Sequence, residues 1–190
     1  MTERPLRADA RRNRERLLEV AMRAFSEQGP DATLDAIART AGVGIGTLYR
    51  HFPTREALIE EVYRAELTRL CDAAPALLES LPPDEALRTW MDRFIEYLAA
   101  KRGLADALRV VIAAGGQPFA HSRERLVGAL AVLLPAAGLD ASSSDDVLMS
   151  LNGISLTAGD PAQRPQAARL LDLLMDGLRY RRTAPAVPLP

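Results

Sequence analysis

The chain has 190 residues, of which 48% are hydrophobic and 26% charged, and this balance excludes a disordered protein. Its formal net charge of −1 excludes a protein that binds nucleic acid through a large overall positive charge. Cys71 is the only cysteine, which excludes an intrachain disulfide and a metal site built on paired cysteines.

Helical spacing of apolar residues begins near the N-terminus, and no segment alternates convincingly in the manner of a strand. Gly29 and the proline after it are expected to end a long first helix. Thr33 is expected to cap a short second helix, and a tight glycine turn at 42–44 leads into a third, which Pro53 ends. The expected ranges of these three helices are 8–28, 34–41 and 46–51.

Six longer helices are expected to follow and to form a bundle, so the predicted fold is all-α. Thr54 is placed to cap the first of them, and Pro75 is expected to kink this helix or to end it early. The tail 183–190 is rich in proline and is expected to be disordered. The six expected ranges are 54–80, 82 to beyond Tyr97, 104–114, 118–137, 145–158 and 165–181.

The longest apolar run, residues 128–139, is too short to cross a bilayer and is broken by a proline. The charged N-terminus does not resemble a secretory signal. We therefore expect a cytoplasmic protein that has no contact with a membrane.

Two short helices joined by a glycine turn, after a supporting helix, form a helix-turn-helix unit. In such units the second helix lies in the major groove of DNA. Gly44 and Gly46 allow the backbone to approach DNA closely, and Arg50 is able to reach a guanine edge or a phosphate. The alternative interpretation is a solvated, glycine-rich loop. Residues 1–18 add six arginines against three acidic residues.

The segment TLDAIARTAGVGIGTLYRHFPTREALIEEVY, residues 33–63, closely resembles the DNA-binding domain of the TetR (tetracycline-repressor-like) transcriptional regulators. The resemblance covers about residues 12–63. It implies an N-terminal three-helix DNA-binding domain and an Ω-shaped homodimer that binds double-stranded, palindromic operator DNA. It also implies a repressor that a small effector in the C-terminal domain releases from DNA, and the apolar, partly aromatic residues of the predicted pocket favour a hydrophobic effector.

The resemblance assigns DNA contacts by position. Thr33, Tyr49 and His51 stand where phosphate contacts occur, and Arg55 replaces a phosphate-binding lysine. The positions where base contacts occur are Ile45, Gly46, Thr47 and Arg50. Two residues depart from the pattern: Gly44 replaces a common capping serine, and Asp35 replaces a basic or neutral residue.

The predicted domains are a helix-turn-helix domain over 8–53 and a ligand-binding and dimerisation domain over 54–182, followed by the tail. A ligand pocket is predicted beside Trp90, Phe94 and Tyr97, although plain core packing explains these residues equally well. His121 is a further pocket candidate, with a surface or capping role favoured.

The last two helices are predicted to form the dimer interface, because the final helix is apolar over more than one face. The alternative is that both helices only close the chain's own bundle. The interface residues predicted are Leu148, Leu151, Ile154, Ser155, Leu170, Leu171, Leu174 and Leu178.

No histidine–carboxylate spacing suits a metal, and no nucleophile motif or cluster of acid and base groups is present. We therefore predict no cofactor, no metal and no enzymatic activity. The competing hypothesis is a helical small-molecule-binding protein or enzyme without a DNA function, and a gel-shift experiment separates the two.

Overall fold

The computed structural model of the chain describes residues 3–157 and 161–183, and every regular element within those ranges is helical. The chain divides into two compact units. The first is built from the residues up to Glu66 together with Ala100–Pro118, and the second from Leu67–Ala99 together with the residues from Phe119 onward. The predicted all-α fold is confirmed. Among the described helices, none has the length and apolar character needed to cross a membrane.

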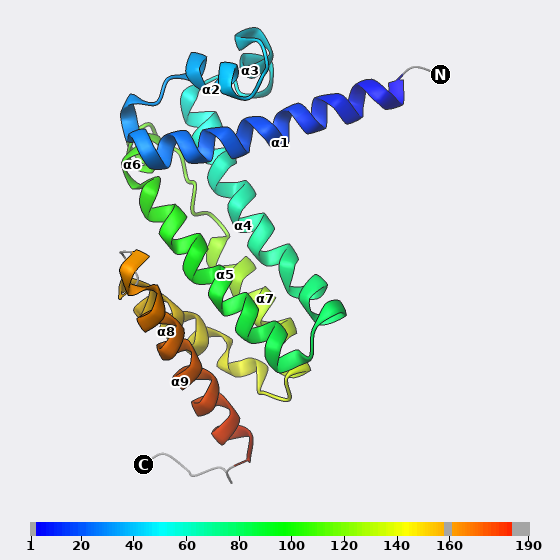
Figure 1. Cartoon of the computed structure of the whole chain (residues 1–190), viewed down its shortest axis with the longest axis vertical. Coiled ribbons are helices and arrows are strands. Elements are labelled where there is room, and N and C mark those ends of the chain that lie inside the picture. Colours follow the sequence, from blue (N-terminus) through cyan, green and yellow to red (C-terminus); the bar gives the residue numbers. More distant parts are fainter. Residues whose placement is uncertain (1–2, 158–160, 184–190) are drawn as a thin grey trace. The chain divides into compact units, whose positions relative to one another are not determined.

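The first unit contains the two short helices that the sequence predicted. They are joined by a turn and lie side by side at one end of the unit, next to α1 (Figure 1). The helices of this unit are α1 (Glu3–Gln28), α2 (Leu34–Thr40), α3 (Ile45–His51), α6 (Ala105–Ala113) and the first part of α4 (Arg55–Ser80). Its largest buried side chains include Phe25, Leu48, Phe52, Leu58 and Tyr63.

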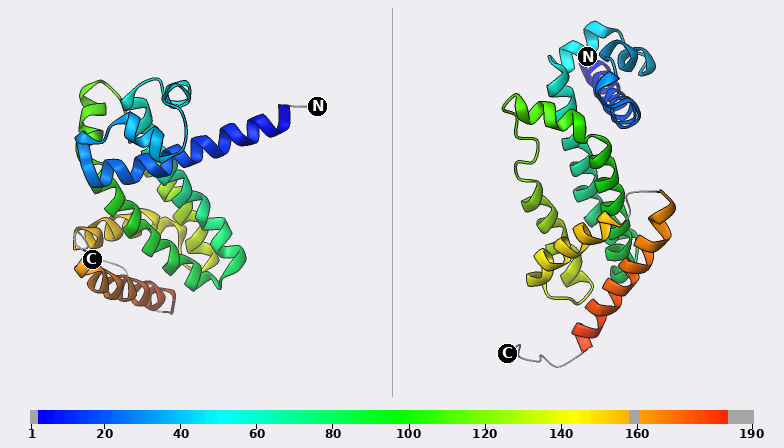
Figure 2. Two further views of the ribbon diagram at one scale, coloured as in Figure 1. Left: turned by 45° about the horizontal axis from the view of Figure 1, so that its top comes forward. Right: turned by 90° about the vertical axis from the view of Figure 1, so that its left-hand side faces the viewer.

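The second unit contains the remainder of α4 and most of α5, followed by three further helices. Within it α8 and α9 lie side by side (Figure 2). Its helices after α4 are α5 (Pro83–Gly103, up to Ala99), α7 (Ser122–Ala136), α8 (Ser144–Leu156) and α9 (Arg164–Thr183). Short 3₁₀ turns lie at Gly29–Asp31 in the first unit, and at Ala141–Ser143 and Pro161–Gln163 in the second. Its largest buried side chains include Trp90, Leu87, Met91 and Phe94.

Several helix boundaries differ from the prediction. Helix α1 begins at Glu3 rather than at residue 8, because a proline in the first turn removes no intrahelical hydrogen bond. Helix α7 begins only at Ser122, since His121 has a φ of 61°, a left-handed conformation outside the helical range. Apart from Thr183, which ends α9, the predicted disordered tail lies outside the described residues.

Of the two effects predicted for Pro75, a kink or an early end of its helix, the early end is wrong, because α4 continues through Pro75 to Ser80, the expected last residue. Pro75 itself is exposed, while Ala74 before it and Leu77 after it are buried. Burial of apolar side chains on both sides of the proline favours a continuous helix over the one backbone hydrogen bond that proline removes.

Ion pairs hold α9 against α5 inside the second unit. Arg88 on α5 donates to the Asp172 carboxylate over 2.8 Å and to the Ala168 carbonyl over 3.2 Å. Further along, Arg179 on α9 donates to Asp84 of α5 over 3.0 Å. These contacts fix both the height and the rotation of α9 on α5.

Candidate nucleic-acid interface

The α2–turn–α3 segment has the local geometry that its sequence predicts. The Thr33 hydroxyl accepts a hydrogen bond from the Ala36 N–H over 3.2 Å, so Thr33 caps α2 as expected. Gly42 in the turn has a φ of 66°, a conformation that residues with a Cβ rarely adopt. The turn therefore requires glycine at this position, and it fixes the direction in which α3 leaves α2.

Helix α3 is held by two buried residues, and part of its remaining surface faces outward. Leu48 and Phe52 are 0% and 1% exposed, so they anchor the helix to the rest of the unit. Tyr49 and Arg50 lie between them in sequence and are exposed. Gly44 begins the helix without any side-chain cap, so the serine cap that the resemblance implies at this position is lost here.

The glycines of this segment leave an open surface. A Cβ added at Gly44 or Gly46 would meet no atom within 4 Å. Both residues are exposed, so packing of the protein itself does not require glycine at either position. A large partner that approaches α3 closely does supply such a requirement.

A set of contacts that the sequence did not reveal holds the end of α3. The Arg14 guanidinium of α1 lies 5.5 Å from the centroid of the Phe52 ring and forms an ion pair with Glu61 of α4. Arg64 pairs with the same carboxylate. Glu61 thus joins α1 to α4 beside Phe52, the residue at the end of α3. Arg14 and Glu61 are 47 positions apart, so no local sequence pattern links them.

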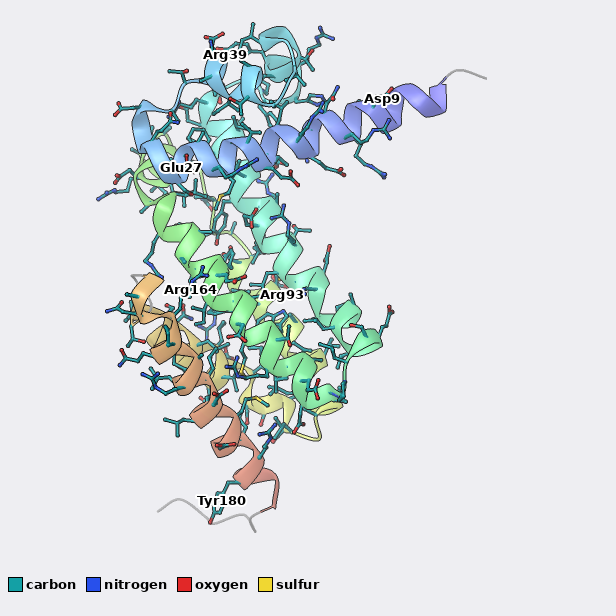
Figure 3. The ribbon with its side chains drawn as sticks, viewed as in Figure 1. Asp9, Glu27, Arg39, Arg93, Arg164 and Tyr180 are labelled. Carbon is teal, nitrogen blue, oxygen red and sulfur yellow. The ribbon has the colours of Figure 1, made fainter. Side chains whose placement is uncertain are left out.

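Two exposed arginines of the first unit add positive charge beside α2 and were missed by sequence reasoning. Arg39 lies in the last turn of α2, where Figure 3 labels it. Arg23 of α1 lines a cleft of about 180 Å³ between α1 and α2, together with Thr33 and Thr40. The only available signal was the position of Arg39 just before the glycine turn.

Arg55 is placed differently from the other predicted DNA contacts. Its guanidinium donates to the Ala32 carbonyl and lies over the Phe25 ring, 4.9 Å from the ring centroid. His51 is half-buried, with its ring 6.1 Å from that of Phe52. The remaining predicted contacts, Ile45, Gly46, Thr47, Tyr49 and Arg50, lie together on α3.

The predicted pocket residues of α5 are tightly packed in the second unit. Trp90 and Phe94 have no exposed surface, and Tyr97 is 6% exposed. Their rings form a chain with centroid separations of 5.8 and 6.1 Å. His121 lies at the surface, with its side chain 78% exposed and beside Glu124, as the favoured interpretation held. The aromatic residues are part of the core, and their role as a pocket stays a prediction.

Much of the predicted dimer stripe faces the chain's own core instead of solvent. Leu148, Leu151, Ser155, Leu171 and Leu178 are all buried, which is the alternative that the sequence left open. Ile154, Leu170 and Leu174 are half-buried. Most of the exposed apolar residues of these helices lie one position along the chain from predicted interface residues. The sequence did not show this, because a helical pattern alone leaves the rotation of the helix undetermined.

We call this exposed surface the α8–α9 stripe. Its members recur at i, i+4 and i+7 on each helix, and they are Met149, Gly153, Leu156, Leu173, Gly177 and Tyr180. Leu156 is 80% and Leu173 66% exposed, unusually open for large apolar side chains. The two glycines have open space around the position of a Cβ, so the surface between the large residues is smooth.

Comparisons with known proteins agree with a helix-turn-helix segment followed by a helical C-terminal domain. Residues 17–62 match the model of the bacterial regulatory proteins of the tetR family, and residues 82–180 match that of the SbtR-like transcriptional regulator C-terminal domain. A helix-turn-helix-type transcriptional regulator of Staphylococcus aureus is 40% identical over 63 residues. That stretch is 33% of this chain and 34% of the relative, so the similarity spans about a third of each.

Two solved structures are similar over nearly the whole chain. A TetR transcriptional regulator from Streptomyces coelicolor is 55% identical, with a TM-score of 0.82, over 87% of this chain and 97% of its own. A TetR transcription regulatory protein from Mycobacterium vanbaalenii is 35% identical, with a TM-score of 0.74, over 92% and 99%. The resemblance recognised in the sequence is therefore confirmed, and the chain belongs to the tetR family of DNA-binding bacterial transcriptional regulators.

Proposed function

We propose that the protein is a repressor that binds a palindromic operator as a two-fold dimer and leaves it when a small hydrophobic effector binds. The observation that carries the DNA part is the surface of α3. Tyr49 and Arg50 are exposed on a helix that buried Leu48 and Phe52 hold in place. A rigid helix with exposed polar side chains suits the major groove.

Arg50 is proposed to read a base edge, with Ile45, Gly46 and Thr47 beside it on the same helix. Tyr49, His51 and Thr33 are proposed to contact phosphates. We add Arg39 as a proposed phosphate contact, because it is exposed in the last turn of α2, near the glycine turn. Phosphate contacts fix the register of the protein on DNA, and base contacts supply the sequence preference.

The test of the DNA role is selection of bound sequences from random duplexes, followed by salt-dependent binding measurements. Arg50→Ala is expected to weaken binding to the selected DNA site by roughly 1–3 kcal/mol. It should also relax the base preference at one position of that site. Arg39→Ala is the matched comparison and is expected to weaken binding to all DNA sequences alike. The slope of log affinity against log salt concentration, here called the salt slope, should become smaller by about 0.9. Failure of the unmodified chain to enrich any sequence contradicts the proposal.

The dimer is proposed to form through the α8–α9 stripe of each copy. Half-sites about 34–36 Å apart require a two-fold assembly to present two reading helices. The stripe supports this role because its large apolar residues are exposed while the opposite faces of both helices are already buried. Leu170 and Leu174, half-buried beside Leu173, extend the same face.

The effector is proposed to bind beside Trp90, Phe94 and Tyr97, where apolar and aromatic surface is concentrated. Since Trp90 and Phe94 have no exposed surface, a ligand there has to displace packed side chains. Helix α4 contributes Leu70 to this region and begins at Arg55 in the DNA-binding unit, so it is one continuous element belonging to both units. A ligand shifts the DNA-binding equilibrium only if it binds the two states with different affinity.

Effector binding is tested by following Trp90 emission and operator release during titration with hydrophobic compounds. Trp90 is the only tryptophan, so the signal reports on this region alone. A coupling of about 1–3 kcal/mol weakens operator binding roughly 5- to 150-fold. A compound that changes Trp90 emission but leaves operator affinity unchanged contradicts the coupling.

A further inference from the structure

Arg55 is the first residue of α4, and its side chain reaches the segment that links α1 to α2. The Thr54 hydroxyl caps α4 by accepting the Ala57 N–H over 3.1 Å. A cation in the first turn of a helix is opposed by the helix dipole, so the dipole of α4 does not favour the charge of Arg55. Its guanidinium instead donates to the Ala32 carbonyl and reaches the Gly29 carbonyl at 3.5 Å.

The same guanidinium lies over the Phe25 ring of α1, 4.9 Å from its centroid. Phe25 is fully buried and Ala32 is 1% exposed, so the cation contacts the inside of the unit. A buried carbonyl such as that of Ala32 needs a donor, and the guanidinium supplies it. Arg55 therefore connects α1, the link between α1 and α2, and α4.

The carbonyl that Arg55 holds directly precedes the start of α2. Thr33 follows Ala32 and caps α2 through both its hydroxyl, which accepts from Ala36, and its carbonyl, which accepts from Ile37 over 3.1 Å. Helix α2 in turn carries α3 through the turn at Gly42. The position of the reading helix thus depends on where Ala32 is held.

We propose that Arg55 is a positioning residue of the DNA-binding unit, which fixes the start of α2 from inside, and that it is not a phosphate ligand. A lysine at this position, as in the resemblance, offers a point charge on a flexible stem. Only a planar guanidinium donates in the plane to carbonyls while one face lies on an aromatic ring. The DNA arm of the test rests on the proposed function; the arm on the free protein does not.

The first arm measures operator affinity over a range of salt concentrations for Arg55→Lys and Arg55→Gln. We expect Arg55→Lys to lose about tenfold in affinity at every salt concentration, as loss of a charge-assisted hydrogen bond predicts. The salt slope of both variants is expected to equal that of the unmodified chain. Arg39→Ala is the comparison, with a slope smaller by about 0.9. Unchanged affinity for Arg55→Lys, together with a slope about 0.9 smaller for Arg55→Gln, overturns the proposal.

The second arm needs no DNA and compares amide hydrogen exchange at Ala36 and Ile37 in the full chain. We expect Arg55→Lys to accelerate exchange at both amides about tenfold, because the cap of α2 is then held less firmly. Thr33→Ala is the positive control at Ala36, whose N–H bonds to the Thr33 hydroxyl. Exchange that is unchanged in Arg55→Lys overturns the positioning role.

A measurement on the unmodified chain protects against a variant that fails to fold. The Nε–H and Nη–H resonances of Arg55 are followed by NMR with and without operator DNA. We expect them to keep their shifts, while those of Arg50 move. A shift at Arg55 equal to that at Arg50 overturns the proposal. If the chain binds no operator, the proposed function fails, and the exchange measurement still decides the role of Arg55.

Discussion

Trp90 donates its indole N–H to the main-chain carbonyl of Leu70 over 2.9 Å, and no part of its side chain is exposed. The bond joins α5 to α4 inside the second unit. Buried indole groups are favourable only when the N–H finds an acceptor, and here the acceptor is a backbone group of α4. Trp90 is thus fixed by a directed bond as well as by packing.

Replacing Trp90 by Phe is expected to lower the free energy of unfolding by about 2–4 kcal/mol. The change leaves a cavity and removes the donor to the Leu70 carbonyl. Urea denaturation measures the effect, and Tyr49→Phe, at an exposed position, should stay within about 0.5 kcal/mol of the unmodified chain. A cost for Trp90→Phe as small as that of the control would contradict a packed, bonded indole.

Gly46→Ala is expected to keep the fold and to weaken operator binding. The added Cβ meets no atom of the protein within 4 Å, and alanine favours the helix by about 0.5–1 kcal/mol. The close approach of DNA is what the methyl group obstructs. Thermal unfolding and gel-shift titration of the same variant separate the two effects.

Gly42→Ala is the matched comparison. It is expected to lower the stability of the fold, which Gly46→Ala is expected to keep. Its φ of 66° is strained for alanine, so the free energy of unfolding should fall by about 1 kcal/mol. The melting temperature should fall with it. Equal stability of the Gly42 and Gly46 variants would argue against the turn geometry.

Leu173→Glu is expected to yield a folded monomer. Leu173 is 66% exposed, so the charge costs little in the isolated chain but is buried without a partner when two copies meet. Sedimentation velocity reports the assembly, and circular dichroism reports the fold. Val132→Glu on α7, 50% exposed and outside the α8–α9 stripe, is the control and should remain dimeric. A dimeric Leu173→Glu protein would exclude this surface as the interface.

Cys71 is expected to react slowly with alkylating reagents at neutral pH. Burial raises the pKa of its thiol, and Asp72 raises it further, while the Arg125 guanidinium acts in the opposite direction. Since the thiolate is the reactive form, the rate should rise with pH and should level off at a higher pH than the rate of a free cysteine does. Arg125→Gln should slow the reaction further, and Arg123→Gln should not. A rate at pH 7 equal to that of a free cysteine would contradict a thiol whose pKa is raised by burial.

The DNA-binding segment was predictable because its signals are local. Thr33 caps α2, Gly42 makes the turn and Leu48 and Phe52 anchor α3, all within 20 residues of sequence. Each of these residue types has one strong conformational or packing preference, so sequence spacing alone indicated the arrangement.

The rest depended on contacts between distant residues. The Arg14–Glu61 pair and the bond from Trp90 to Leu70 join different helices and leave no local pattern. The sequence left the rotation of α8 and α9 undetermined for a related reason. Both helices carry apolar residues on more than one face, and only packing against the other helices decides that Leu171 is buried and Leu173 exposed.

The ion pairs between α5 and α9 have a consequence for how the protein responds to salt. Arg88 holds Ala168 and Asp172, and Arg179 holds Asp84, so exposed ion pairs help to hold α9, and with it Leu173, in place on α5. Salt normally strengthens association between apolar surfaces, but it screens exposed ion pairs. In a dimer joined by the α8–α9 stripe, rising ionic strength weakens the ion pairs that hold α9 on α5. The apolar contact between the two copies contains no charge, but it depends on the position of α9. Ionic strength then acts on such a regulator at two places, the phosphates of its DNA and the helix that joins its two copies.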